Sequence, residues 1–488
     1  MDSAISSNNT QTAFLAVAIA VLFGWLYHKH KLSRPNLPPG SFGIGEVIGF
    51  ARALKGGTAH KWIEERVARH GPIFMTSFMG NRIVVVTGSV GNKFVFTSGD
   101  DALKSHQPKP VFHITGEKSI FEVHGARHKL VKGAIAGFLR PESLQRFIPL
   151  MSSLTEGYLT EEVENKDSVY GVILLKKIAF KVSMAVLFSL TDDEETDKLF
   201  DEFLLVLKCG WILPIYLPFT PYYRVLAARR RIYGRFSAIL DERRRKLEDG
   251  SVSPNDDIIA TMLSMRDEEG RALPRREIID NLITIVFASH DTGVSLTASF
   301  VRHLAMNEVT LQRVYEEHTK ILNETKDETL TWSDIQKMKY TWSVAQELMR
   351  IDPPAFGNFR ITARDIDFNG YTIPKGWNVH WVTYTHMDKT AFPEPEKFDP
   401  TRFEGVLKSF PPYTYVPFGG GQRVCPGSHF ARVSLSLIIH HLVMNFRWSM
   451  LVPGEPVVRK PFAYPAKDLP IKVYKKEKEK KEKEEEAS

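Results

Sequence analysis

The chain has 488 residues, of which 43% are hydrophobic and 25% are charged, as in an ordinary globular protein with a large core. Lys and Arg outnumber Asp and Glu by 64 to 57, which fits an anionic membrane surface, an acidic protein partner or a generic basic surface. No nucleic-acid-binding module is recognisable, so nucleic acid is not an expected partner. The only two cysteines, Cys209 and Cys425, exclude a disulfide framework and a cysteine-rich zinc site and favour a reducing compartment.

The N-terminal region predicts a membrane anchor. Residues 12–27 are apolar and uncharged, and basic residues 28–31 follow them at once. The run is slightly short for the roughly 20 residues that cross a bilayer core. A cleaved signal peptide is the alternative, but in such a peptide the basic residues would precede the apolar run. We therefore predict a single-pass anchor over residues 1–31, with the rest of the chain in the cytosol.

Three further segments follow the anchor. Residues 32–41 are rich in proline, which stops a helix and makes a stiff hinge. No linker interrupts residues 42–474, so they are predicted to form one catalytic domain. Residues 475–488 are almost entirely Lys and Glu and are expected to form a solvated tail.

Within the predicted domain, helical patterns dominate and strand signals are short. This predicts a mainly α fold with small β-sheets. The apolar, proline-rich segment 213–223 is predicted either to dip into the membrane near a substrate entrance or to form an internal loop. In chain order, the predicted regular elements are a strand at 82–87, helices at 277–306 and 332–350, a strand at 378–383 and a helix that begins at 427.

The most informative segment is FGGGQRVCPG, residues 418–427. Glycines let a backbone approach a flat ligand closely, and the loop delivers Cys425 to a helix start, where free N–H groups favour a thiolate. Arg423 adds a cation for an anionic group on the ligand. This arrangement predicts a thiolate ligand for iron beneath a macrocycle that carries carboxylates. A lone cysteine is more often an inert packing residue, and that is the prediction for Cys209.

The loop fits the pattern F-x-x-G-x-R-x-C-x-G, and at this point the chain resembles the cytochrome P450 superfamily. The resemblance implies the cytochrome P450 fold and haem b as cofactor, with Cys425 as the axial ligand of the haem iron. The other residues of the pattern are then cofactor-binding residues: Phe418, Gly421, Arg423 and Gly427.

Other motifs of that superfamily occur in the expected order. Residues 347–350 (ELMR) match its E-x-x-R motif, in which Glu347 and Arg350 share one helix face. The resemblance implies that Arg402 completes a buried structural triad with them. Arg360 stands where the superfamily places an arginine that binds a haem propionate. His128 and Lys132 stand at its W-x-x-x-R positions and are implied as further haem-binding residues.

Residues 288–292 (ASHDT) resemble the superfamily's oxygen-activating motif. The resemblance implies that Asp291 and Thr292 are catalytic and relay protons to iron-bound oxygen, while the thiolate pushes electron density from the other face. Ser289 stands where the superfamily usually has glycine. Serine is still small, and the feature on which this departure bears is the width of the oxygen groove.

Over nearly its whole length the chain resembles plant terpenoid-oxidising members, among them β-amyrin oxidases and taxoid hydroxylases. This implies a haem-thiolate monooxygenase at the endoplasmic reticulum membrane, acting on a triterpenoid, diterpenoid, sterol or strigolactone. Electrons from NADPH would arrive through a separate NADPH–cytochrome P450 reductase, and membrane lipid would be a further partner. Segments 111–114, 285–288, 354–356 and 462–464 are predicted to line the cavity, with His113 as an orienting donor.

Two other functions remain open at this point. One is an oxygen-independent haem-thiolate isomerase or dehydratase, and such members commonly lose the acid–alcohol pair that Asp291 and Thr292 form here. The other is a haem-binding scaffold without catalysis, for which a broken cysteine loop would be typical. Both motifs are intact in this chain.

Overall fold

The computed structural model of the protein describes residues 36–78, 81–164, 166–212, 214–325, 329–405, 410–459 and 462–476. The predicted anchor, residues 32–35 of the predicted hinge and all of the predicted tail beyond residue 476 lie outside these ranges. Among the described residues, no helix has both the length and the apolar character needed to cross a membrane.

Most of the regular structure is helical. The helices are α2 (Ile44–Lys55), α3 (Ala59–His70), α4 (Gly88–Thr97), α5 (Lys109–Thr115), α6 (Gly125–Phe138), α7 (Pro141–Leu144), α8 (Ile148–Val163), α9 (Gly171–Phe188), α10 (Asp193–Leu207), α11 (Pro221–Glu248), α12 (Ile258–Ser264), α13 (Arg275–Met306), α14 (Glu308–Glu324), α15 (Trp332–Lys337), α16 (Lys339–Ile351) and α17 (Ser428–Asn445).

In the described part of the chain the strands are short and form four sheets. They are β1 (Ile73–Phe78), β2 (Asn81–Val86), β3 (Leu103–Ser105), β4 (Ser168–Tyr170), β5 (Gly357–Thr362), β6 (Ile366–Phe368), β7 (Tyr371–Ile373), β8 (Asn378–Val382), β9 (Phe446–Met450), β10 (Val457–Arg459), β11 (Ala463–Pro465) and β12 (Pro470–Lys475). The largest sheet has the order β1-β2-β8-β5-β3, in which only the β2–β8 pair is parallel. The predicted mainly α fold with small sheets is confirmed.

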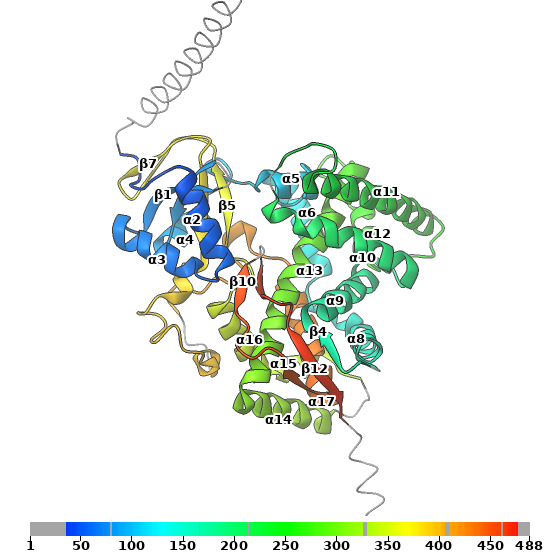
Figure 1. Cartoon of the computed structure of the whole chain (residues 1–488). Coiled ribbons are helices and arrows are strands. Elements are labelled where there is room, and N and C mark those ends of the chain that lie inside the picture. The colour runs from blue at the N-terminus through cyan, green and yellow to red at the C-terminus, as the bar shows by residue number, and fades with distance from the viewer. Residues whose placement is uncertain are drawn as a thin grey trace, which may run out of the picture.

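Helix α13 organises the molecule. In Figure 1 the five-stranded sheet and helices α2 to α4 lie on one side, helices α9 to α12 lie on the other, and α13 runs between them. It packs against α9, α16 and α17, and its residues from Glu277 to Phe287 are all buried. Its predicted bounds, 277–306, agree closely with the observed Arg275–Met306, because Pro274 precedes its first turn.

The prediction of one helix over residues 332–350 was wrong, because the chain forms two helices there. Met338 leaves the helical conformation between α15 and α16, with ψ at 60°. The carboxylate of Glu317, from α14, accepts hydrogen bonds from the N–H groups of Tyr340 (2.6 Å) and Thr341 (2.9 Å). A side chain from a distant helix therefore caps the new helix start, which no local pattern could reveal.

The described part of the predicted hinge is attached to two sheets, the five-stranded sheet that contains β1 and the two-stranded sheet β6-β7. Met75 of β1 donates its N–H to the carbonyl of Pro39 (2.7 Å), and Thr372 of β7 donates to the carbonyl of Asn36 (2.8 Å). A Cβ atom at Gly40 would lie 2.1 Å from the Met75 carbonyl oxygen, so only glycine permits this approach. Residues 36–40 are therefore a fixed edge of the domain.

Several buried histidines make the fold sensitive to acid. Burial lowers the pKa of His318, His380 and His386 to about 3 and that of His440 to about 2. In the unfolded chain these side chains take up protons below a pKa of about 6.5, so unfolding becomes easier as the pH falls below that value.

We expect each such histidine to contribute about 2 kcal/mol of lost stability between about pH 7 and about pH 5. Chemical unfolding measured over this pH range should show a steep fall in the free energy of unfolding. In His380→Phe this free energy should fall less steeply with pH. His429→Gln, at an exposed position, is the matched control and should leave the slope unchanged. An unchanged slope in His380→Phe would contradict the account.

Candidate active site

A largely apolar cavity of about 510 Å³ separates α13 from the cysteine loop. One wall is formed by Ala288, Ser289 and Thr292 of α13, and the opposite wall contains Phe418 and Cys425. A flat macrocycle with one axial protein ligand needs such a slot, with the ligand on one face and room for reactants on the other.

The Cys425 thiol belongs to this cavity. Cys425 has solvent-accessible surface, but it lies inside the protein and lines the cavity. Its accessible surface therefore faces the cavity interior. The Gly427 N–H points at its sulfur (3.4 Å), and the Cys425 N–H donates to the carbonyl of Phe418 (3.0 Å). Burial raises the pKa of the Cys425 thiol, while the Gly427 N–H and the Lys132 ammonium oppose that rise. These are groups that stabilise a thiolate once a metal binds it.

Gly421 has a packing role in the structure. It does not line the cavity, although glycines in this loop were predicted to let the backbone approach the ligand. Its φ is +64°, and a Cβ atom there would lie 1.9 Å from the carbonyl oxygen of Phe96, at the end of α4. Gly420, which does line the cavity, also packs on Phe96, whose ring carbon would lie 2.6 Å from a Cβ atom. The loop is therefore shaped by α4.

Gly421→Ala is expected to displace the loop from α4 and to cost about 2 kcal/mol or more of stability, because both the close contact and the positive φ penalise a side chain. Thermal unfolding and the retained haem content would measure the effect. Gly133→Ala, in α6 with open space around the glycine, is the control and should be neutral or slightly stabilising. Equal behaviour of the two variants would contradict the packing role.

Arg360 is the strongest indication of an anionic ligand. Its side chain is buried and lines the cavity, and its guanidinium donates to the carbonyl of Phe359 (2.8 Å). Among the described residues it forms no ion pair. Burial, with repulsion from Arg423, lowers its pKa to about 10. A buried cation without a counter-charge is costly, so the geometry fits a carboxylate supplied by a ligand, such as a haem propionate.

The other predicted cationic residues gather at the same end of the cavity. Arg423 lines it but is already anchored to Asp100 (3.3 Å) and to the carbonyls of Ile120 and Val123 (3.0 and 2.8 Å). Lys132 also lines the cavity and donates to the carbonyl of Gln422 (2.6 Å). Within the described part of the chain, Arg360, Arg423 and Lys132 thus bring three positive charges together near the carboxylates of Asp100 and Glu122, so positive charge is in excess.

His128, the remaining predicted haem-binding residue, is buried and also lines the cavity. Burial, together with Arg423 and Lys132, lowers its pKa to about 4, so the imidazole is neutral at physiological pH. It can therefore offer a hydrogen bond to a ligand carboxylate, but not a charge.

The two predicted catalytic residues face different ways. Thr292 lines the cavity, and its hydroxyl donates to the carbonyl of Ala288 (2.7 Å). Asp291 is buried and absent from the lining, and its carboxylate contacts Lys176 (3.1 Å) and the Tyr464 hydroxyl (2.8 Å). The Ser289 hydroxyl is buried next to the cavity and has no hydrogen-bond partner within the described part of the chain.

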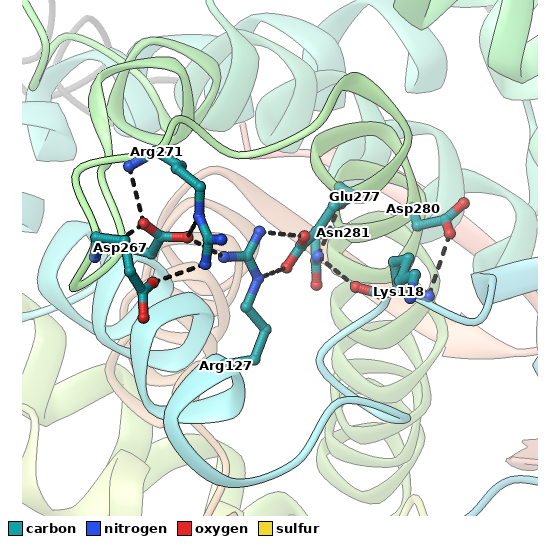
Figure 2. Close-up of polar contacts among 8 residues, drawn as sticks. Lys118, Arg127, Asp267, Arg271, Glu277, Asp280 and Asn281 are labelled. Carbon is teal, nitrogen blue, oxygen red and sulfur yellow. Dashed lines mark hydrogen bonds and ion pairs between the residues drawn. The ribbon is translucent and has the colours of Figure 1, made fainter.

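A polar network fixes the N-terminal half of α13 to α6, the helix that carries His128 and Lys132. Figure 2 shows Arg127 of α6 between two carboxylates: Glu277 of α13 (2.7 and 2.6 Å) and Asp267 (3.3 Å). Asn281 donates to the carbonyl of Lys118 (3.1 Å), and it accepts the N–H of Ile120 (2.7 Å). These bonds fix the distance between two walls of the site.

The predicted lining segments are only partly correct. Each contributes to the cavity, but the residues that line it are Val111, Ile285, Phe287, Ala288, Pro354, Ala355, Phe356 and Phe462. His113 does not line the cavity; its Nδ1 contacts the Tyr222 hydroxyl of α11. Sequence reasoning missed Asp100 and Lys176, whose roles depend on contacts between distant segments.

Comparison with known proteins identifies the family. The cytochrome P450 family model matches residues 35–473. Taxane 10-beta-hydroxylase of Taxus cuspidata is 36% identical over 467 residues, 94% of each chain, and a beta-amyrin 28-monooxygenase of Vitis vinifera is 35% identical over 94% of this chain and 96% of its own length. A retinoic acid-bound cyanobacterial CYP120A1 has a TM-score of 0.80 at 28% identity, covering 90% of this chain and 100% of that one. The chain therefore belongs to the cytochrome P450 family and is a P450 monooxygenase.

Proposed function

We propose that the protein hydroxylates a neutral, hydrophobic, isoprenoid-derived substrate at a haem b group whose iron Cys425 binds. The family implies the haem, and the observation that carries the proposal is the slot in which Cys425 faces Ala288, Ser289 and Thr292 across an apolar cavity. When bound, the haem supplies activation of molecular oxygen. Residues of this chain would hold the haem, position the substrate and relay protons.

The charged residues divide the site into a cofactor end and a substrate region. Arg360, Arg423 and Lys132, with the neutral His128, would hold the haem carboxylates. The side chains named above for the predicted lining segments are all apolar, so a charged substrate would lose its hydration without gaining a partner. A neutral terpenoid fits this division, and the relatives are named for taxanes and for beta-amyrin.

Within this class the substrate is a triterpenoid, diterpenoid, sterol or strigolactone. Its shape must match the apolar wall formed by Val111, Phe287, Phe356 and Phe462, since positioning of one C–H bond depends on packing. An oxygen-independent isomerase or dehydratase is the alternative function. The retained Asp291 and Thr292 favour hydroxylation over it.

The proposal includes a membrane setting and a redox partner. Residues 12–27 would anchor the protein in the endoplasmic reticulum membrane, with electrons from NADPH delivered by NADPH–cytochrome P450 reductase. The loop between α10 and α11 supports a lipid contact, because Ile215, Tyr216, Leu217 and Phe219 are 50–85% exposed there. Exposed apolar side chains gathered on one loop are typical of a membrane-facing surface.

The test is co-expression with a plant reductase in microsomes. NADPH, heavy-isotope oxygen gas and a panel of triterpenoids, diterpenoids, sterols and strigolactones would be supplied, and products read by mass. We expect one labelled oxygen atom in a product of one substrate class. An unlabelled product that forms without NADPH would establish the alternative function.

Asp291→Asn and Thr292→Ala test the roles of the two predicted catalytic residues. Each removes a group that can relay a proton to the oxygen side of the site, and we expect product formed per NADPH consumed to fall about tenfold to a hundredfold. In Asp291→Asn substrate affinity should change little, because Asp291 does not line the cavity. Full coupling in both variants would contradict the relay. Thr297→Ala, at another cavity-lining threonine of α13, is the matched control.

A further inference from the structure

A buried histidine of the five-stranded sheet lines the cavity without a partner. His380, in β8, is 5% exposed and belongs to the cavity wall. Its Nδ1 is buried without a hydrogen-bond partner, and within the described part of the chain no hydrogen bond reaches its Nε2 either. A neutral imidazole carries one N–H donor and one lone-pair acceptor, and native proteins seldom bury such groups unpaired. The side chain therefore keeps an unused capacity to bind a ligand.

The ring of His380 is held in a fixed plane by aromatic neighbours. It stacks on the Phe359 ring, with 4.3 Å between the ring centres and 8° between the planes. Phe359 stacks in turn on Phe78 of β1, at 5.4 Å and 24°. Both phenylalanines line the cavity, as does Phe50 of α2. One polar group of fixed orientation thus adjoins an apolar, aromatic part of the cavity wall.

Gly357, at the start of β5, leaves the Nε2 atom of this histidine uncovered. A Cβ atom at position 357 would lie 3.0 Å from His380 Nε2 and 2.0 Å from the carbonyl oxygen of Trp381, so a side chain does not fit there. Gly357 itself lines the cavity, next to Phe356 of the apolar wall. The missing side chain therefore opens the imidazole nitrogen to the region in which the substrate is proposed to bind.

His380 belongs to the substrate region and not to the cofactor end. Successive side chains of a strand point to opposite faces of a sheet, so Arg360 and Phe359 lie on opposite faces of β5. His380 pairs with Phe359 across the sheet and shares its face, whereas Val379 pairs with Arg360. Burial lowers the pKa of His380 to about 3, so the imidazole is neutral at physiological pH. It suits an uncharged oxygen atom better than a haem carboxylate.

The surroundings of the ring decide which nitrogen carries the proton. The Nδ1 atom is buried away from the cavity, so a proton there would stay unpaired, whereas a proton on Nε2 can reach a ligand. Proteins tolerate a buried N–H without an acceptor less readily than an acceptor without a donor. The Nε2–H group is therefore the donor on the cavity side. Hydroxyl and carbonyl oxygens accept such a bond, and a hydrocarbon does not.

We propose that the Nε2–H group of His380 binds a neutral oxygen atom of the substrate, either a hydroxyl or a carbonyl. This inference rests on the proposed function and narrows its substrate class to isoprenoid-derived compounds that already carry oxygen. His380 is then a specificity-determining residue, which orients an otherwise apolar molecule in the cavity. An earlier reaction that introduces oxygen must supply the substrate, and this protein adds a further oxygen atom.

The test measures equilibrium binding to the purified, haem-loaded protein through the shift of the haem absorption band. The probes are three pairs of an alcohol and the hydrocarbon with the same skeleton: β-amyrin, cholesterol and a taxadienol, each with its deoxy counterpart. The ketone of β-amyrin is a further probe. In the wild type we expect an alcohol that binds to do so about tenfold or more tightly than its hydrocarbon, because the hydrocarbon leaves the imidazole unpaired.

His380→Phe keeps an aromatic ring beside Phe359 and removes both ring nitrogens. We expect this variant to bind the alcohol about tenfold more weakly and the hydrocarbon equally well, so that the two affinities become similar. His380→Gln keeps a donor and should restore part of the preference. Equal weakening of both members of a pair in His380→Phe, or equal binding of both by the wild type, would overturn the inference. A ketone that binds like the hydrocarbon would contradict the donor role of Nε2–H and overturn it as well.

His303→Phe is the matched control. His303 of α13 also packs on a phenylalanine, Phe398, with 3.7 Å between the ring centres. Its Nε2 is likewise buried without a partner within the described part of the chain, but His303 does not line the cavity. The control should therefore leave every affinity unchanged. If it removes the preference for the alcohol as His380→Phe does, the effect reflects general packing and the inference is wrong.

Turnover separates this inference from the proposed function. If His380→Phe removes the preference but the wild-type protein inserts no labelled oxygen into any probe, the recognition holds and the proposed function fails. If labelled oxygen is inserted and the preference does not depend on His380, the proposed function holds and the recognition fails. Binding of no probe by the wild type would exclude these isoprenoid classes and overturn both.

Discussion

Cys425→Ser is expected to abolish thiolate ligation of the haem and to lower product formation at least about a thousandfold, which corresponds to ~4 kcal/mol in the activation free energy. A serine hydroxyl keeps its proton at neutral pH and cannot push electron density to the iron as a thiolate does. The Cys425 sulfur is the group that the loop presents to the cavity, and the Gly427 N–H that faces it would have no anion to stabilise. The reduced carbon monoxide difference spectrum measures the loss, because its thiolate band should disappear.

Cys209→Ser is the matched control, since Cys209 is the only other cysteine of the sequence. We expect this variant to keep both the thiolate band and product formation. A thiolate band that survives in Cys425→Ser and disappears in Cys209→Ser would reverse the assignment of the iron ligand. Haem content should be measured in parallel, so that a loss of the group is distinguished from a change of its ligand.

Features that depend on neighbouring residues could be predicted from the sequence. The cysteine loop combines glycines, a cation and a thiol within ten positions, and the structure places Phe418, Arg423 and Cys425 at one cavity. Helix α13 was predicted almost to its ends, because no proline interrupts it after Pro274. In both cases the deciding residues lie in one continuous stretch of the sequence. A local pattern is therefore enough to predict the feature.

Features that depend on distant residues could not be predicted in this way. The direction of the Asp291 side chain is decided by Lys176 and Tyr464, which are more than a hundred positions away in the sequence. The break at Met338 depends on Glu317 of another helix, and the need for glycine at position 421 depends on Phe96. Each of these outcomes follows from packing between elements, which the pattern of a single segment does not encode.

Glu347→Gln is expected to lower the free energy of unfolding by about 3–5 kcal/mol. The side chains of Glu347 and Arg350 are both 0% exposed, and two hydrogen bonds of 2.7 and 2.8 Å join them. The substitution keeps the size of the side chain but leaves the Arg350 charge buried without a counter-charge. Arg402, whose Nε lies 3.5 Å from Glu347, loses this ion pair as well and keeps its hydrogen bond to the carbonyl of Glu394 (3.1 Å). Chemical unfolding followed by fluorescence would measure the change.

The exposed pair Glu242–Lys246 of α11 provides the control for this prediction. It is also a carboxylate–cation contact within one helix, at 2.7 Å and with Lys in place of Arg. Its side chains are 45–55% exposed, so solvent screens the pair and side-chain entropy opposes it. Glu242→Gln should therefore leave the unfolding midpoint nearly unchanged. If both variants lose the same stability, the loss would reflect helix charge in general and not burial. If neither variant loses stability, the buried pair contributes little to the stability of this fold. The Arg350 guanidinium also donates to the carbonyls of His386 (3.0 Å) and Lys397 (3.3 Å). These main-chain contacts would then be enough to hold Arg350 in place.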